Sequence, residues 1–138
     1  MPKILLAEDN PADIYLIREA LKEHGVTCPI QIASDGRDVL DIIARMRLPG
    51  EQVDLIILDL NLPRHDGLEI LQRLRETVGF GGAPVVVLTS SDSPRDKNRA
   101  KELGAARFLL KPPNLEQFLG LGAVFKDLLA LKTESGEF

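Results

Sequence analysis

Five polar side chains that could do chemistry each stand at the end of a short apolar run: Glu8, Asp9, Asp59, Thr89 and Lys111. Three of them are carboxylates, one is a hydroxyl and one is an ammonium. Two carboxylates about 4 Å apart repel each other by roughly 4 kcal/mol at an effective dielectric constant of about 20. Three together therefore need a raised pKa or a neutralising cation. Ligands that are all oxygen favour Mg²⁺.

This set contains what is needed to phosphorylate a carboxylate. Phosphoryl transfer requires an in-line nucleophile, a metal ion and groups that contact the equatorial oxygens. Asp59, alone after a central apolar run, is the predicted nucleophile. Glu8 and Asp9 would hold the metal, and Thr89 and Lys111 would contact the phosphoryl oxygens.

Five apolar runs rich in Ile, Leu and Val must position these side chains, and we predict that each is a strand: 3–7, 29–33, 53–58, 84–89 and 107–110. Three of them contain continuous rather than alternating apolar residues, which is typical of strands buried on both faces of a parallel sheet. Helix start signals lie between and after the runs, at Asn10-Pro11, Asp35-Gly36, Gly67-Leu68, Ser93-Pro94 and Asn114 with Gln117.

Five consecutive strand–helix units with right-handed crossovers predict an α/β fold with a doubly wound five-stranded parallel sheet. The expected strand order is 2-1-3-4-5, as in flavodoxin-like folds, in which the binding crevice lies at the carboxyl ends of strands one and three. The five polar side chains should therefore meet at one edge of the sheet.

The length and composition indicate one domain over residues 1–131, with a polar C-terminal tail at 132–138. Seventeen Lys and Arg residues against 21 Asp and Glu residues give a net charge of -4, which argues against binding to nucleic acid. The single cysteine, Cys28, cannot form an internal disulfide. Because no apolar run is long enough to span a membrane and acidic residues appear early, we expect a cytoplasmic protein without membrane contact.

Four sequence signatures occur in order along the chain: Leu6–Asn10, Asp59–Pro63 with Asp66-Gly67, Leu88–Ser90 and Leu110–Pro112. Together they resemble the receiver domain of two-component response regulators, the CheY-like family, over 2–131. The segments around Glu8-Asp9-Asn10-Pro11-Ala12-Asp13 and Asp59–Pro63 are similar to stand-alone regulators that are paired with phytochrome-type kinases.

The resemblance implies a signalling protein and not an enzyme in the ordinary sense. Asp59 would accept a phosphoryl group from the phosphohistidine of a sensor histidine kinase. Asp9 matches the direct Mg²⁺ ligand, Glu8 matches an acidic neighbour that acts mostly through water, and the backbone carbonyl of Asn61 matches a further ligand. The downstream protein target is not identified by these residues.

Further positions gain roles from the same resemblance. Thr89 and Phe108 match a switch in which the threonine moves toward the phosphoryl group and the aromatic ring turns inward. The Lys111–Pro112 peptide bond matches one that is usually cis in the family. Asn61 and Ser91 occupy positions that tune dephosphorylation.

Other functions are weighed against this one. A phosphatase of the aspartyl-phosphate type would need an acid two residues after the nucleophile, where Asn61 stands. A nucleotide-binding module would need a glycine-rich turn where the sequence has Glu8–Pro11. The remaining alternative is a receiver-like adaptor that is never phosphorylated and acts only by binding proteins.

The last predicted helix, Asn114–Leu131, carries more apolar residues than one buried stripe requires. Its apolar arc covers roughly 240° at about 100° per residue, whereas a buried stripe covers a little over about 100°. We therefore expect a second, exposed stripe formed by Leu121, Val124, Leu128 and Leu131. An exposed patch of this kind indicates a partner surface. The sequence thus predicts a homodimer through the face of the fourth helix, fifth strand and fifth helix, unless the tail folds back over the stripe.

Overall fold

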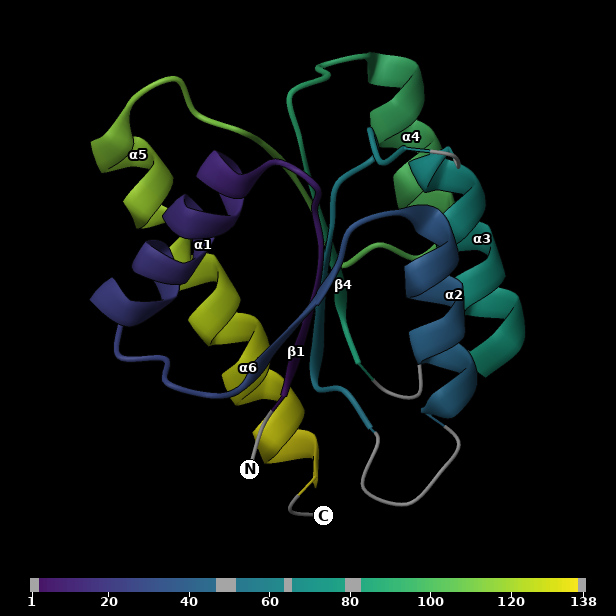
Figure 1. Ribbon diagram of the computed structural model, residues 1–138, viewed down its shortest axis with the longest axis horizontal. Helices are drawn as coiled ribbons and strands as arrows, with labels where there is room; N and C mark the ends of the chain where they lie inside the picture. Colours follow the sequence, from purple (N-terminus) through teal and green to yellow (C-terminus); the bar gives the residue numbers. More distant parts are fainter. Residues whose placement is uncertain (1–2, 47–51, 64–65, 79–82, 137–138) are drawn as a thin grey trace.

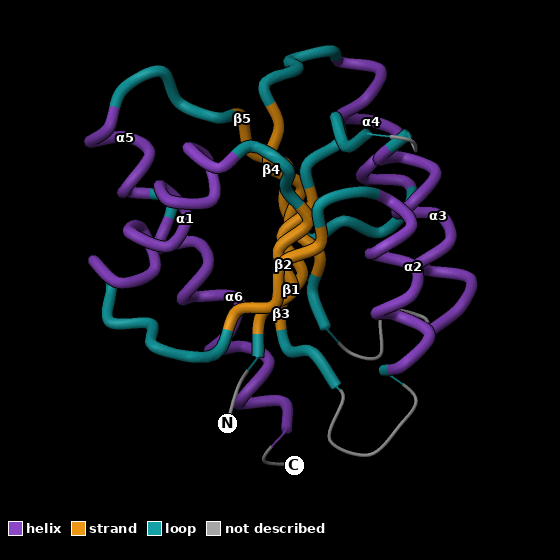
Figure 2. Tube along the Cα trace, in the orientation of Figure 1, coloured by secondary structure: helices purple, strands orange, loops and turns teal. Residues whose placement is uncertain are grey.

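The computed structural model describes residues 3–46, 52–63, 66–78 and 83–136. Its five strands are β1 (Ile4–Ala7), β2 (Ile30–Ala33), β3 (Leu55–Leu58), β4 (Val85–Thr89) and β5 (Arg107–Leu110). They form one parallel sheet in the order β2-β1-β3-β4-β5, as predicted. Figure 2 shows these strands at the centre of the molecule.

Helices cover both faces of this sheet. On one side lie α1 (Pro11–Glu23), α5 (Leu115–Gly120) and α6 (Gly122–Gly136), and on the other lie α2 (Gly36–Arg45), α3 (Gly67–Val78) and α4 (Pro94–Glu102) (Figure 1). Every residue of β1, β3 and β4 is therefore buried, which is the physical reason for their continuous apolar sequences. The edge strand β5 is only partly covered.

The helices begin where their capping residues predicted. At five of these starts the side chain of the N-cap residue accepts a hydrogen bond from a free backbone N–H; these caps are Asn10, Asp35, Asp66, Ser93 and Asn114. Among the described residues, none of the helices has both the length and the apolar character that a membrane crossing requires.

The C-terminal segment differs from the prediction of one helix over Asn114–Leu131. Two helices, α5 and α6, meet at Leu121, and α6 continues to Gly136. At Gly122 an added Cβ would lie 2.1 Å from the backbone oxygen of Ala20 in α1. Helices α1 and α6 thus approach so closely at Gly122 that only glycine fits there. The break at Leu121 lets α6 follow α1.

The expected exposed stripe is also corrected by the structure. Leu128 is buried, and Leu121 and Val124 are half-buried against the same apolar cluster. The side chain of Leu131 lies outside the described residues. Because α6 packs against both α1 and β3, its wide apolar arc is covered from two sides within one chain.

Candidate functional site

The carboxyl ends of neighbouring strands bring the predicted side chains to one edge of the sheet. Ala7 of β1 is paired with Leu58 of β3, so Glu8 and Asp59 follow side by side. The Asp59 backbone N–H donates to the Ala7 carbonyl at 3.0 Å. The Lys111 backbone N–H donates to the carbonyl of Thr89 at 2.8 Å, which fixes the start of the last loop beside β4.

The Lys111 ammonium is the centre of this edge. Its Nζ atom donates to Glu8 Oε1 at 2.8 Å, to Asp13 Oδ2 at 2.7 Å and to Asp59 Oδ2 at 3.0 Å. A lysine ammonium has three donors, so each has a carboxylate partner here. The Glu8 and Asp59 side chains are only 1% and 5% exposed, so these are ion pairs largely shielded from water.

Sequence reasoning missed Asp13. This residue lies in the first turn of α1, so it does not follow a strand directly and is part of no separate motif. One signal was present, because a helix that starts directly after β1 keeps its first turn at the same edge of the sheet. The approach of Asp13 to Lys111, which is 98 residues away in the chain, is nevertheless a property of the tertiary structure.

Glu8, Asp9 and Asp59 form an acidic cluster that could hold a metal ion. One carboxylate oxygen from each lies within 4.8 Å of the others; Glu8 and Asp59 are buried, and Asp9 is exposed. Backbone donors orient the two buried carboxylates. Glu8 Oε2 accepts from the backbone N–H groups of Asp9 and Asn10, and Asp59 Oδ1 accepts from that of Asn61 at 2.9 Å. An exposed carboxylate beside two buried, oriented ones fits a hard divalent cation that enters from solvent.

Burial and charge set the protonation of the site. Burial raises the pKa of Glu8 to about 7, the charge of Asp59 acts in the same direction, and the hydrogen bond from Lys111 opposes both. Burial also acts to lower the pKa of Lys111. Its hydrogen bonds to Asp13, Glu8 and Asp59 outweigh that effect and raise the pKa above the ordinary value for lysine. Lys111 is therefore a permanent cation, whereas Glu8 changes charge near neutral pH.

Thr89 lies fully buried at the end of β4. Its Oγ atom accepts hydrogen bonds from the Asn61 side-chain amide and from the Ser91 backbone N–H, both at 3.2 Å. The Ser91 hydroxyl itself donates to Asp96 Oδ2 of α4 at 3.4 Å. Phe108 of β5 is half-buried against the apolar cluster on the α2, α3 and α4 side.

The cis prediction for Lys111–Pro112 is wrong. None of the peptide bonds within the described ranges is cis, so this bond is trans. The trans isomer of a bond to proline is intrinsically favoured by about 0.5–1 kcal/mol. Since Lys111 already reaches all three carboxylates with a trans bond, its contacts do not require the other isomer.

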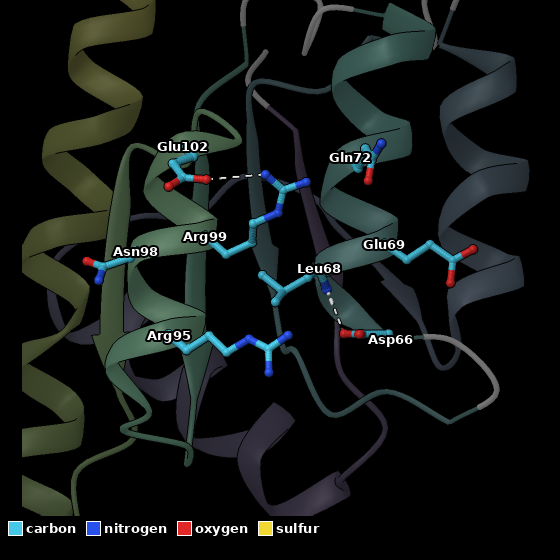
Figure 3. A pocket seen from close by; sticks show the side chains of 8 residues that line it. All are labelled: Asp66, Leu68, Glu69, Gln72, Arg95, Asn98, Arg99 and Glu102. Carbon is cyan, nitrogen blue, oxygen red and sulfur yellow. Dashed lines mark hydrogen bonds and ion pairs between the residues drawn. The ribbon is translucent and has the colours of Figure 1, made fainter.

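A cavity of about 470 Å³ between α3 and α4 is separate from this site (Figure 3). Its lining carries both signs of charge, and Arg99 pairs with Glu102 of the same helix, α4, at 3.3 Å. Asp66, at its rim, accepts a hydrogen bond from the backbone N–H of Leu68 and so caps α3. None of the five polar side chains predicted at the strand ends lines this cavity, so we do not assign the phosphoryl chemistry to it.

The chain is similar to known proteins over most of its length. The model of the response regulator receiver domain matches residues 4–121. Response regulator MprA of Mycolicibacterium vanbaalenii is 35% identical over 117 residues, which cover 85% of this chain and 47% of MprA. The chain thus spans about half the length of that relative. Response regulator Rcp1 of Synechocystis is 37% identical over 118 residues, covering 82% of this chain and 78% of Rcp1.

Solved structures of response regulators are also similar to this chain. The phosphorylated cyanobacterial phytochrome response regulator RcpA superposes with a TM-score of 0.83 at 32% identity, covering 94% of both chains. The Mn²⁺-bound form of response regulator Rcp1 superposes with a TM-score of 0.76 at 34% identity, covering 91% of this chain and 92% of Rcp1.

Proposed function

The chain belongs to the response regulator receiver family, and from this premise we propose that it carries a two-component signal by accepting a phosphoryl group on Asp59. One observation supports this most directly. Asp59 is a buried residue whose carboxylate belongs to the acidic cluster and also lies 3.0 Å from Lys111 Nζ. A nucleophile beside a cation site and a fixed positive charge is the arrangement that phosphoryl transfer requires.

The donor is the phosphohistidine of a sensor histidine kinase. A carboxylate oxygen of Asp59 attacks the phosphorus atom, and the bond between phosphorus and the imidazole nitrogen breaks. Its electron pair stays on that nitrogen, which takes up a proton, and Asp59 becomes an acyl phosphate. Lys111 and the hydroxyl of Thr89 contact the phosphoryl oxygens in this proposal.

Mg²⁺ is the proposed cofactor. Asp9, Glu8, Asp59 and the backbone carbonyl of Asn61 would hold it, and it would neutralise charge on the transferring group. The acidic cluster supports this, as does the relative Rcp1, whose structure is a Mn²⁺-bound form.

The output of the phosphorylated state is a changed protein surface. Thr89 and Phe108 lie on the same face of the sheet, because Thr89 shares a face with Val87, the register partner of Phe108. A shift of the Thr89 hydroxyl toward the phosphoryl group would free space for the ring. Asn61 and Ser91, which both donate to that hydroxyl, are placed to tune the lifetime of the phosphoryl group.

The proposed partners are a sensor kinase of the phytochrome type and a second copy of this chain, in the cytoplasm. The likeness to Rcp1 and RcpA supports the first. The second copy would contact the face of α4, β5 and α5, where the edge strand ends in Leu110, which is 47% exposed. Sedimentation showing only a monomer at tens of micromolar, with and without phosphorylation, would contradict the dimer.

Incubation with acetyl phosphate and Mg²⁺, followed by intact-mass measurement, tests the phosphorylation. We expect the wild type to gain the mass of one phosphoryl group, and Asp59→Asn or an excess of chelator to prevent the gain. An unchanged wild-type mass would support the adaptor function instead. An equal gain in Asp59→Asn would place the phosphoryl group on another residue.

A further inference from the structure

We propose that Asp13 is a positioning residue, which anchors Lys111 independently of the metal site; this inference rests on the proposed function. The shortest of the three Lys111 contacts is the one to Asp13, at 2.7 Å. Charge-assisted hydrogen bonds of this length are among the stronger polar contacts in proteins.

Two of the three carboxylates around Lys111 are shared with the acidic cluster. Glu8 and Asp59 also belong to the acidic cluster, whereas Asp13 does not. A divalent cation and the Lys111 ammonium therefore compete for Glu8 and Asp59. Asp13 is the partner that Lys111 keeps when the other two carboxylates neutralise a metal ion.

Asp13 is held well enough to act as an anchor. Its backbone N–H and that of Ala12 donate to the Asn10 side chain, which fixes the first turn of α1. Further along the same helix, Ile17 and Leu21 are buried in the core. A carboxylate on a rigid, capped helix turn fixes the position of its partner better than one on a loop.

A simpler role for Asp13 must be separated from this one. An acidic residue in the first turn stabilises a helix through its dipole, wherever the helix lies. Asp38 provides the matched control, because it occupies the corresponding position in α2 and accepts a hydrogen bond from the Ser34 backbone N–H. Asp38→Asn removes the same charge from the same helix position but leaves the Lys111 contacts intact.

Calorimetric titration with Mg²⁺ alone tests the anchor. Without Asp13, a metal ion would leave Lys111 with no carboxylate of its own, so we expect Asp13→Asn to weaken Mg²⁺ binding about tenfold. Asp38→Asn should change it by less than about twofold. In a Lys111→Met background, Asp13→Asn should also have an effect below about twofold, because its partner is absent.

Two results would overturn the proposal. An equal loss of Mg²⁺ affinity in both backgrounds would show that Asp13 acts only through its negative charge and not through Lys111. No loss of affinity in either background would show that Asp13 has no effect on the site.

A second measurement does not depend on the folding of Lys111→Met. At saturating Mg²⁺, Asp13→Asn should accept a phosphoryl group from acetyl phosphate about tenfold more slowly than the wild type, because Lys111 is less well placed. Equal rates at saturating Mg²⁺ would overturn the proposal. Failure of the wild type to gain phosphoryl mass would instead contradict phosphorylation of Asp59, and the Mg²⁺ titrations would still decide whether Asp13 acts through Lys111.

Discussion

The side-chain amide of Asn61, in the loop after β3, donates a hydrogen bond of 3.2 Å to Oγ of Thr89 at the end of β4. The Ser91 backbone N–H donates to the same oxygen at the same distance. A hydroxyl accepts two hydrogen bonds and donates one, so both acceptor positions of Thr89 are filled. The remaining proton is the part of Thr89 that can be donated to a phosphoryl oxygen.

If the Thr89 hydroxyl donates this proton to the phosphoryl group, the position of the Phe108 ring should depend on that hydroxyl. The chain contains no tryptophan, so Phe108→Trp introduces a unique fluorescent reporter. With acetyl phosphate and Mg²⁺, we expect its emission to shift to the blue as the ring becomes more buried. Adding Thr89→Val removes the hydroxyl, and the shift should disappear although intact mass still shows phosphorylation. A shift that persists in Thr89→Val would contradict the coupling, and Asp59→Asn serves as the unphosphorylated control.

The pKa of Glu8 predicts a dependence of stability on pH. Its folded value of about 7 lies above the ordinary value of 4.5, so protonated Glu8 favours the folded state. This contribution is fully present below pH 4.5 and is lost as the pH rises through about 7. Without divalent cations, the difference in unfolding free energy between Glu8→Gln and the wild type should therefore shift in favour of the variant as the pH rises from 5 to 8. The expected shift is about 2 kcal/mol. Urea unfolding at both pH values measures it, and an equal difference at the two would refute the prediction.

The contact between α1 and α6 predicts opposite effects at two nearby glycines. Gly122→Ala places a methyl group 2.1 Å from the Ala20 carbonyl oxygen and should cost about 3 kcal/mol of unfolding free energy. The Cβ of Gly120→Ala meets no atom within 4 Å beyond its own helix backbone, and the variant should be neutral or stabilise by up to about 1 kcal/mol. Chemical denaturation of both variants measures the difference. Similar stabilities would mean that α6 does not lie against α1 at this point.

Two leucines of the C-terminal helices should respond differently to truncation. Leu128 is buried, so Leu128→Ala should lower the unfolding free energy by about 2–3 kcal/mol through loss of core contacts. Leu115 is 60% exposed, and Leu115→Ala should change it by less than about 0.5 kcal/mol. Thermal and urea unfolding of the two variants provides the measurement. A Leu128→Ala protein of unchanged stability but altered self-association would contradict this prediction and would place Leu128 in an interface between copies of the chain.

The local sequence was sufficient for the strands and for most of the site. Continuous apolar runs such as Leu55–Leu58 predicted buried parallel strands, and five consecutive strand–helix units predicted the strand order of flavodoxin-like folds. Once the order is known, residues directly after β1 and β3 must lie together, because parallel strands end at the same edge. The juxtaposition of Glu8 and Asp59 could therefore be predicted without a structure.

The sequence by itself determined which segments are apolar, where helices begin and which polar side chains stand at the strand ends. Only the tertiary structure decided that Asp13 reaches Lys111, that the last helix breaks before Gly122 and that Leu128 is covered. The physical reason is the distance along the chain over which each interaction acts. Periodicity and capping act over a few residues, whereas these three features depend on how closely α1 packs against partners about 100 residues further along the chain.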